Sequence, residues 1–385
     1  MIRFLHTSDW HLGKMLYGHS LLPDQEYFLR EVFLPVVRAE RPDFVVLAGD
    51  IFDRQIAPVE AIRLFDEILV RMSRELRVPF FVITGNHDGA ARVSMGASLL
   101  ESEGVFLRSG LEEISRPVRL TIHEQPVHIY LLPYFDPAAA RAAFADEGIR
   151  GFEEAYAAAL GRITAGLEPG ALNILVSHCF VAGSVSSESE GPICVGGSAE
   201  VPAALFSAFD YVALGHLHAP QRAGDNGYYA GSPLKYSFDE ASQRKGLQLV
   251  ELEKGAHSIR MLPVAPLREL RVLEGSFEEL LTSGREVPTE DYCFALLKDD
   301  APVYMPVDRL RPYYPNLLGL RSEWMQSRPP SAEGENLRGR FLSGGDSDLS
   351  IFESFFSQIC GREATEEDRA VFLRAAAATR GEGSL

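Results

Sequence analysis

The chain has 385 residues, of which 46% are hydrophobic and 24% charged, and this composition is typical of a globular protein with more than one domain. No apolar run is long enough to span a bilayer, and a strand-like pattern begins at once without a signal peptide, so neither a membrane protein nor a secreted one is expected. The net charge of −17 argues against a protein that holds nucleic acid by itself, because phosphate binding normally recruits Lys and Arg. Four scattered cysteines without a CxxC pair (Cys179, Cys194, Cys293 and Cys360) indicate free thiols and a cytoplasmic location.

The first part of the chain alternates between strand-like and helix-like segments. Strands are predicted at residues 2–7, 44–48 and 80–83, and helices at 24–40 and 59–76. Further strands are predicted at residues 127–132, 172–176, 211–214 and 247–252, separated by less regular stretches. This alternation favours an α/β domain over residues 1–265, in which a second sheet faces the first.

Prolines near residues 263–266 mark a boundary, after which a smaller pattern begins. Residues 266–326 are expected to form a small α/β module, and residues 327–348, rich in Ser, Pro and Gly, a linker. Residues 349–385 are predicted to be helical, with Phe352, Phe355, Phe356 and Ile359 on one face of the first helix. That face either packs on its own chain or binds a partner, and the preceding linker favours the partner.

Polar residues follow five of the predicted strands. They are Asp9 and His11, then Asp50 and Asp53, then Asn86, His87 and Asp88, then His178, and finally His216 and His218. Because the carboxyl ends of parallel strands open on one crevice, these side chains are expected to converge. Any single histidine among them is more often a packed core residue, but five of the ten histidines of the chain occur in this pattern.

The residue types suit a site with two metal ions. Carboxylates, imidazoles and an amide oxygen are ligands for Mn, Fe or Zn, and no cysteine is among these residues to build a structural zinc site. Asp50 is well placed to bridge two ions, and glycines at 49, 85 and 215 allow sharp turns at the strand ends. Two divalent ions can polarise a phosphate and generate a hydroxide nucleophile, so the sequence predicts a phosphoesterase.

These ordered motifs, Asp-x-His, Gly-Asp-x-x-Asp, Gly-Asn-His-Asp, a later His and Gly-His-x-His, resemble those of the calcineurin-like metallophosphoesterases. The resemblance implies a four-layer fold, in which two facing sheets are flanked by helices. It implies one metal held by Asp9, His11, Asp50 and His218, and a second held by Asp50, Asn86, His178 and His216. It also implies that His87 is the catalytic histidine and that Asp53 orients it.

Longer matches resemble the SbcD family of bacterial exonuclease subunits. They are residues 7–13 (TSDWHLG), 49–54 (GDIFDR), 132–134 (LPY), 196–198 (GGS) and 231–238 (GSPLKYSF). This resemblance implies a Mn-dependent DNA exonuclease and endonuclease that works with an SbcC-like ATPase in DNA repair, recombination and replication. It also implies that residues 266–326 form a DNA-facing cap and that residues 349–385 grip the ATPase. The chain itself has no Walker pattern, so ATP hydrolysis must come from another chain.

Several alternatives stay open at this point. A phosphoesterase acting on small molecules or proteins is the main rival, although it would not require the cap and the tail, and a scaffold without catalysis is disfavoured because every ligand position is filled. Arg54 and Arg92 either contact phosphate or are solvated, and residues 231–233 are either a substrate-side loop or only a turn. Residues 58–76 and 92–103 match the region where the family dimerises. There Leu64, Ile68 and Met72 either form a shared apolar bundle or pack on the chain's own sheet.

Overall fold

The computed structural model describes residues 1–190, 199–326, 349–350, 352–353, 356–357 and 362–381. The described chain divides into two compact units, Met1–Arg271 and Val272–Leu385. The predicted linker at 327–348 lies outside the described residues, as do Gly196–Ser198, Phe355 and Ile359. Among the described helices, none combines the length and apolar character needed to cross a bilayer.

The first unit is built on two six-stranded sheets. One sheet has the order β16-β15-β1-β4-β5-β6, and the other has the order β13-β14-β12-β9-β8-β7. The strands of the first sheet are β1 (Ile2–Thr7), β4 (Phe44–Ala48), β5 (Phe80–Ile83), β6 (Val105–Arg108), β15 (Gly246–Glu253) and β16 (Ala256–Pro263). Those of the second sheet are β7 (Val118–Ile122), β8 (Gln125–Leu132), β9 (Leu172–His178), β12 (Tyr211–Gly215), β13 (Gln221–Ala223) and β14 (Gly227–Tyr229).

Both sheets have a parallel centre, with antiparallel strands at one edge of the first sheet and at both edges of the second. Strands β1, β4, β5 and β6 run parallel, as do β8, β9, β12 and β14, while β15, β16, β7 and β13 pair antiparallel. The central strands β4, β5, β9 and β12 are buried along their whole length, because each sheet is covered on both faces. The carboxyl ends of these strands therefore supply one edge where loops from both sheets can meet.

Apolar residues of the two sheets form one core between them. Phe4, Phe44 and Phe81 of the first sheet belong to the same cluster as Ile174 and Tyr211 of the second. Phe4 stacks on Phe44 with ring centroids 4.6 Å apart and meets Tyr211 edge-on at 5.3 Å. The two sheets therefore pack face to face, as expected from the sequence.

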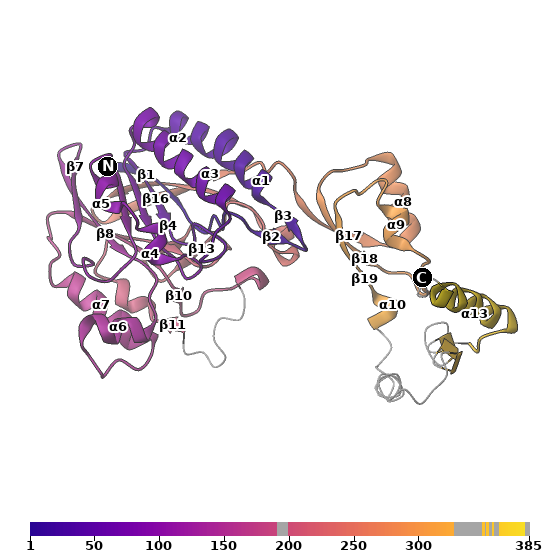
Figure 1. Ribbon diagram of the computed structural model, residues 1–385. Helices are drawn as coiled ribbons and strands as arrows, with labels where there is room; N and C mark the ends of the chain where they lie inside the picture. The colour runs from indigo at the N-terminus through magenta and orange to yellow at the C-terminus, as the bar shows by residue number, and fades with distance from the viewer. Residues whose placement is uncertain (191–198, 327–348, 351, 354–355, 358–361, 382–385) are drawn as a thin grey trace. The chain divides into compact units, whose positions relative to one another are not determined.

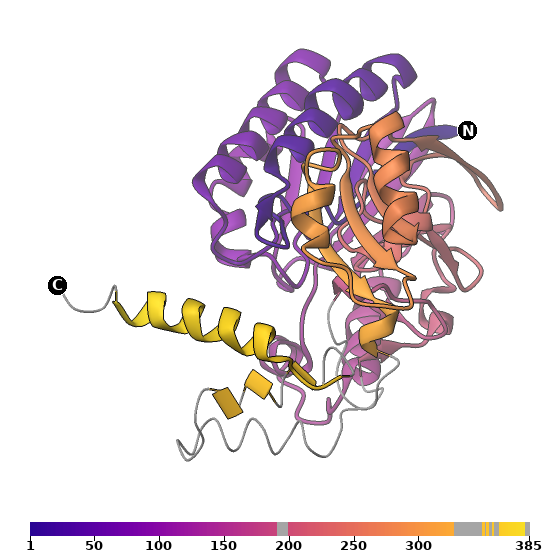
Figure 2. The same ribbon diagram turned by 90° about the vertical axis from the view of Figure 1, so that its right-hand side faces the viewer.

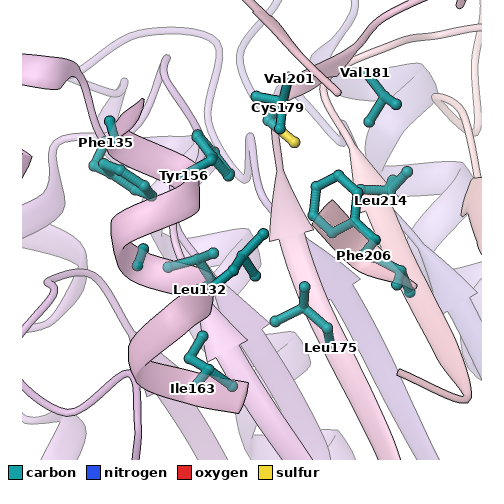
Figure 3. Packing of buried hydrophobic residues seen from close by; sticks show 14 of the residues in the cluster. Leu132, Phe135, Tyr156, Ile163, Leu175, Cys179, Val181, Val201, Phe206 and Leu214 are labelled. Carbon is teal, nitrogen blue, oxygen red and sulfur yellow. The ribbon is translucent and has the colours of Figure 1, made fainter. Parts of the chain in front are cut away.

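Helices cover the outer faces of both sheets. On the first sheet lie α1 (Leu22–Tyr27), η1 (Phe28–Phe33), α2 (Leu34–Glu40), α3 (Val59–Val70) and η2 (Arg71–Leu76) (Figure 1). On the second lie α6 (Pro137–Phe144) and α7 (Phe152–Thr164). Figure 3 shows Tyr156 and Ile163 of α7 beside Leu132 and Leu175 of the sheet. The unit thus has the four layers of a metallophosphoesterase sandwich.

The apolar face that Leu64, Ile68 and Met72 form on α3 and η2 is not available for dimerisation. Leu64 is 5% exposed, and Ile68 and Met72 are fully buried within the unit. The alternative, that this face packs on the chain's own sheet, is therefore confirmed. The reason is the helical spacing of these residues, which points them all toward the sheet that the helix covers.

Several elements have no signal in the sequence analysis. They are the edge strands β6, β7, β13 and β16, the inner strand β14, the helices α6 and α7, and a small hairpin of β2 (Met15–Leu16) and β3 (His19–Ser20). Strand β16 is mostly exposed and pairs only with β15, so its residues show no alternation of apolar and polar types.

The second unit has its own core. The sheet order is β17-β18-β19, formed by β17 (Leu270–Gly275), β18 (Tyr292–Leu297) and β19 (Leu317–Ser322), and the helices are α8 (Phe277–Glu286) and α9 (Pro306–Leu310) (Figure 2). Phe277, Leu280 and Leu281 of α8 pack with Cys293, Ala295 and Leu297 of β18. The strands and helices of this unit give it the α/β character expected for residues 266–326, and a longer helix, α13 (Glu366–Gly381), follows near the C-terminus.

Candidate metal centre

The loops after β1 and β4 are joined through their backbones. The N–H of Asp9 donates to the carbonyl of Gly49 at 3.0 Å, and the N–H of His11 donates to the carbonyl of Asp50 at 3.0 Å. Asp9, His11 and Asp50 have φ angles of 54°, 44° and 50°, and His216 has 102°. Such left-handed conformations are strained for residues with a side chain and cluster at functional sites. Four of the predicted ligand positions share this strain.

Glycines allow the strand ends to approach one another. A Cβ on Gly85 would lie 2.2 Å from Oδ1 of Asp50, and a Cβ on Gly215 would lie 1.9 Å from the carbonyl oxygen of Ala48. Both contacts are far shorter than atoms tolerate, so any larger residue would push the β5 and β12 loops away from the β4 loop. These two glycines are required for the five loops to converge.

The first group of converging side chains is Asp9, His11, Asp50 and His218. Nε2 of His11 lies 3.1 Å from Nε2 of His218 and 3.5 Å from Oδ2 of Asp50. Ligand atoms of Asp9, His11 and His218 all lie within 4.8 Å of one another. All four residues are buried. This is the set that the family resemblance assigns to the first metal.

The second group is Asp50, Asn86, His178 and His216. Oδ1 of Asn86 lies 3.0 Å from Nε2 of His178 and 2.9 Å from Nδ1 of His216. Nε2 of His178 also lies 3.4 Å from Oδ2 of Asp50. The same oxygen of Asp50 therefore faces an imidazole of each group, while Oδ1 accepts the backbone N–H of His87 at 2.9 Å. Asp50 has the position of a bridging ligand.

The donor atoms of both groups fit divalent cations. Nδ1 of His178 lies 2.8 Å from the carbonyl of Ala48, which makes it the proton-bearing nitrogen and leaves the lone pair of Nε2 aimed at the acceptor oxygens of Asn86 and Asp50. Lone pairs that face one another repel unless a positive charge lies between them, which here is a second proton on His178 in the metal-free chain or a bound cation. Mixed imidazole, carboxylate and amide ligands suit a divalent transition metal.

Electrostatics favour neutral imidazoles and charged carboxylates here. Burial lowers the pKa of His216 to about 3 and that of His11 well below its usual value, so both rings offer lone pairs at neutral pH. Burial opposes ionisation of Asp50, but His178 and His11 hold its pKa well below the usual value. His11, His216 and Asp50 are therefore unprotonated ligands, whereas Asp50 and Asp9 raise the pKa of His178 to about 9, so that ring must lose a proton to a cation.

His87 lies beside the first group but makes a different contact from the one expected. Its ring centroid is 4.8 Å from that of His11, and Nδ1 lies 2.8 Å from the backbone carbonyl of Asp53. The carboxylate of Asp53 instead lies 3.0 Å from Nζ of Lys14 and 3.7 Å from Nδ1 of His11. Asp53 thus holds His87 through its main chain, because the strand-end turn directs its side chain toward Lys14.

Asp88 connects two loops of the site, a role that the sequence analysis did not assign. Its buried carboxylate accepts backbone N–H groups from Ile51 at 3.1 Å, Phe52 at 2.9 Å and Gly85 at 2.9 Å. These amides belong to the turns that carry Asp50 and Asn86. Its place in the Gly-Asn-His-Asp motif is the only sequence signal that could have indicated this role.

A buried network behind His218 was also missed. Oγ of Ser189 lies 2.6 Å from Nδ1 of His218 and donates to Glu240, and Oε1 of Glu240 lies 3.4 Å from the same nitrogen. Glu240 forms an ion pair at 2.6 Å with Lys245, whose ammonium also donates to the carbonyl of His218 at 2.8 Å. These contacts fix the imidazole so that Nε2 faces His11. Ser189 comes from the connection between β10 (Phe180–Val181) and β11 (Glu200–Val201), and Glu240 and Lys245 come from the connection between β14 and β15, and none has a motif that would reveal it.

The segment at 231–233 supports the same loop. Gly231 has a φ of 75°, and a Cβ there would lie 2.5 Å from the carbonyl oxygen of His218. The hydroxyl of the buried Ser232 donates to Leu234 at 2.7 Å and lies 3.0 Å from Nζ of Lys245. This segment is therefore a turn packed behind His218.

The sequence left open whether Arg54 and Arg92 contact phosphate or are solvated. Arg92 donates to the carbonyl of Gln55 at 3.1 Å, and the side chain of Arg54 is 55% exposed beside Asp53.

Comparisons with known families agree with this geometry. The family model described as calcineurin-like phosphoesterase matches residues 2–220, more than half of the chain. The model SbcD_C, described as type 5 capsule protein repressor C-terminal domain, matches residues 266–359. The chain belongs to the calcineurin-like phosphoesterase family and is a metal-dependent hydrolase of the SbcD type, with the Asp and His cluster at the strand ends as its candidate metal centre.

Proposed function

We propose that this chain is a Mn-dependent DNA exonuclease and endonuclease that processes DNA ends and hairpins together with an SbcC-like ATPase. The observation that carries the proposal is the presence of a phosphoesterase centre and a match to SbcD_C in one chain. An enzyme for small phosphate esters has no evident use for the second unit, whereas a nuclease that must hold a polymer does. DNA repair, recombination and replication are the processes in which such cleavage is needed.

Each residue of the centre has a defined part in this chemistry. Two bound divalent cations would supply a hydroxide nucleophile and neutralise charge on the phosphodiester. Asp9, His11, Asp50 and His218 would hold one of them, and Asp50, Asn86, His178 and His216 the other. The ligand atoms are nitrogen and oxygen, with no thiolate among them, and this ligand set suits Mn. Fe and Zn are the alternative metals.

His87 would act on the oxygens of the phosphodiester. Because its Nδ1–H donates to the carbonyl of Asp53, Nε2 is the nitrogen left to meet the substrate. As an imidazolium, that nitrogen can donate to a phosphate oxygen in the transition state or protonate the leaving oxygen. His87 would thus be the catalytic residue and Asp53 its positioning residue.

The acidic charge of the chain is consistent with a basic partner. The net charge is −17, and phosphate contacts usually require clustered Lys and Arg. Close to the centre the described chain offers Lys14 and the exposed Arg54. An ATPase subunit would supply the remaining cationic surface, and the cytoplasm is the compartment in which both subunits would meet DNA.

The C-terminal helices are the proposed grip on the ATPase, although part of the predicted apolar face is used within the chain. Phe352 stacks on Phe372 of α13 with ring centroids 4.3 Å apart, and Arg362 lies 4.7 Å above the ring of Phe356. On α13, Val371 and Leu373 are 53% and 50% exposed. We assign the partner surface to residues 349–385, in which these two side chains are exposed.

The experiment that tests the proposal is a nuclease assay of the full chain on linear and hairpin DNA with Mn, Mg or chelator, with and without the ATPase subunit. We expect Mn-dependent cleavage that the ATPase stimulates on both substrates. A second arm deletes residues 346–385, which should abolish binding in a pull-down while Mn-dependent cleavage survives. Hydrolysis of small phosphate esters without any cleavage of DNA would favour the rival phosphoesterase.

A further inference from the structure

One ring nitrogen of His11 makes no hydrogen bond within the part of the chain that the structure describes. Nε2 of His11 lies 3.5 Å from Oδ2 of Asp50 and 3.1 Å from Nε2 of His218, so Nε2 is the nitrogen that faces a bound cation. A neutral imidazole that gives the lone pair of Nε2 to a metal carries its proton on Nδ1. In His11 this Nδ1 is buried and has no acceptor. A buried donor without an acceptor is unfavourable, so a partner for Nδ1 is expected nearby.

Two other imidazoles of the centre do have such a partner. Nδ1 of His178 lies 2.8 Å from the carbonyl of Ala48, and Nδ1 of His218 lies 2.6 Å from Oγ of Ser189. A histidine that binds a metal almost always donates its second N–H to an oxygen, which fixes the orientation of the ring. The lack of this contact at His11 therefore directs attention to the oxygens that lie just beyond hydrogen-bond distance.

A carboxylate oxygen of Asp53 is such an acceptor. Oδ1 of Asp53 lies 3.7 Å from Nδ1 of His11. This oxygen is buried and accepts no hydrogen bond from the described residues, although it forms an ion pair with Nζ of Lys14 at 3.0 Å. A normal N–H···O contact is about 2.9 Å long, so a shift of about 0.8 Å would join the two atoms. One movement would thus satisfy a buried donor and a buried acceptor together.

The same cluster does not suit a third metal ion. Ligand atoms of His11, Asp53 and His87 all lie within 4.8 Å of one another. However, Nδ1 of His11 carries a proton once Nε2 binds a cation, and the ammonium of Lys14 already faces the carboxylate of Asp53. A cation placed there would meet both a ring proton and a positive charge. A hydrogen bond from His11 to Asp53 accounts for the cluster without this repulsion.

We propose that Asp53 is a positioning residue for the metal ligand His11, and that its carboxylate accepts the Nδ1–H hydrogen bond when the first ion is bound. The proposal rests on the ligand set of the proposed function and gives Asp53 two separate contacts. Its main-chain carbonyl lies 2.8 Å from Nδ1 of His87, whereas its carboxylate serves His11. Lys14 supports the arrangement, because its ammonium pairs with Asp53 and its backbone N–H donates to the carbonyl of His11 at 2.9 Å. One residue would thereby fix the catalytic histidine relative to the first metal ion.

Metal binding measured without DNA tests the proposal. Mn is titrated by calorimetry into the metal-free wild type, His11→Ala, Asp53→Ala and Asp53→Asn. We expect the wild type to bind two ions and His11→Ala to lose one of them. Asp53→Ala should bind one of the two ions about 10- to 100-fold more weakly and keep its affinity for the other. Asp53→Asn retains an oxygen that can accept the Nδ1–H group, so its loss should be smaller, and equal losses in the two variants would overturn the hydrogen bond.

Asp210→Ala is the matched control for the loss of a buried ion pair. The side chain of Asp210 is 12% exposed, against 13% for Asp53, and it pairs with Lys254 at 2.9 Å. Asp210 precedes β12, whereas the ligands follow that strand, so it lies at the end away from the centre. Both variants should melt at a lower temperature than the wild type, but only Asp53→Ala should lose metal affinity.

The chain loaded with Zn gives a spectroscopic readout that a purely structural role would not change. Zn is diamagnetic and binds imidazole and carboxylate ligands, so ring protons can be followed by NMR. The Nδ1–H of His11 should exchange slowly with water and give a signal that is absent from His11→Ala. Asp53→Ala should lose this signal, whereas Asp210→Ala should keep it.

The outcomes separate this proposal from those on which it rests. If His11→Ala keeps both ions, the ligand set is wrong and the role of Asp53 with it. If His11→Ala loses an ion but Asp53→Ala binds both with wild-type affinity and keeps the signal, the positioning role alone is wrong. A chain that shows the expected metal binding but cleaves no DNA would contradict the nuclease function and leave the role of Asp53 supported.

Discussion

Oδ2 of Asp50 lies 3.4 Å from Nε2 of His178, and this contact sets the charge of the imidazole before a metal binds. Burial by itself lowers the pKa of His178, but the carboxylates of Asp50 and Asp9 raise it to about 9. In the metal-free chain the ring therefore carries a second proton, on Nε2, at neutral pH, and a cation that binds there must displace it.

The first prediction is that binding of the second ion releases this proton. Affinity should rise about tenfold per pH unit below pH 9 and level off above it, because one proton is exchanged. Calorimetric titration of Mn at pH 7.5 in buffers of different ionisation enthalpy should report the release. The stability that His178 gives the metal-free chain is present below its unfolded pKa of about 6.5 and is lost as pH rises through 9. A metal-free chain that melts at the same temperature at pH 6.5 and 9, with no proton released, would contradict the assignment.

The second prediction separates catalysis from metal binding. His87→Ala should reduce kcat by about a hundredfold or more and leave two ions per chain, because the imidazole is not among the ligand atoms of either group. Asp50→Ala should lose both activity and metal, since Oδ2 faces an imidazole of each group. The measurement is elemental analysis of the purified variants beside a single-turnover cleavage assay. Loss of one ion from His87→Ala would make His87 a ligand instead.

The predicted ligand set could be identified because each ligand is next to the end of a strand. A buried strand followed by Gly-Asp or Gly-Asn-His is a local pattern, and the sheet order then brings the five patterns to one edge. The alternation of strands and helices predicted an α/β domain with a second sheet facing the first, and the family resemblance implied its four layers. What the motif could not give is the geometry inside a loop, such as the contact of His87 with the main-chain carbonyl of Asp53.

Residues that act from outside the motifs could not be predicted. Ser189, Glu240 and Lys245 come together only when two connections, β10–β11 and β14–β15, fold against His218, and these residues have no period or motif of their own. The helix face at Leu64 was ambiguous for a different reason. Helical spacing gives the direction of an apolar face but not the surface that covers it, which here is the chain's own sheet.

The third prediction concerns Asp88. Its carboxylate satisfies three buried backbone N–H groups, and above its pKa, which burial raises to about 7, a hydrogen bond to the charged group contributes about 1.5–3 kcal/mol. Asp88→Ala should lower the free energy of unfolding of the metal-free chain by at least about 3 kcal/mol and weaken metal binding, because the turns of Asp50 and Asn86 lose their connection. The control is Asp136→Ala, which removes an exposed helix cap to Ala139 and should cost only about 1 kcal/mol. Equal losses in the two variants, measured by denaturant titration, would show that Asp88 is not a structural link.

The fourth prediction concerns the buried pair of Glu240 and Lys245. Glu240→Gln leaves the ammonium of Lys245 without its counter-charge and should destabilise the chain by about 3–5 kcal/mol. It should also weaken metal binding about 10- to 100-fold, because Glu240 and Ser189 orient His218. In the double variant Glu240→Gln, Lys245→Met the stability should partly return while metal affinity stays low. Full recovery of both properties would mean that the pair serves only the fold.

The last prediction concerns self-association, which we propose occurs through the exposed surface of residues 58–76 and 92–103. The segment of α4 (Ala90–Val93) and α5 (Ala97–Glu101) exposes Met95 at 84% and Leu99 at 78%, and Ile62 on α3 is 49% exposed. Large apolar side chains of this exposure are favoured where a second copy of the chain covers them. Leu99→Glu should therefore halve the mass measured by light scattering at micromolar concentration and leave the melting temperature of the monomeric unit unchanged. Leu64→Ala is the matched control on the buried face, where loss of a packed side chain should cost about 2–5 kcal/mol of stability without a direct effect on the interface. A wild-type chain that is already monomeric under these conditions would show that the exposed residues serve another contact.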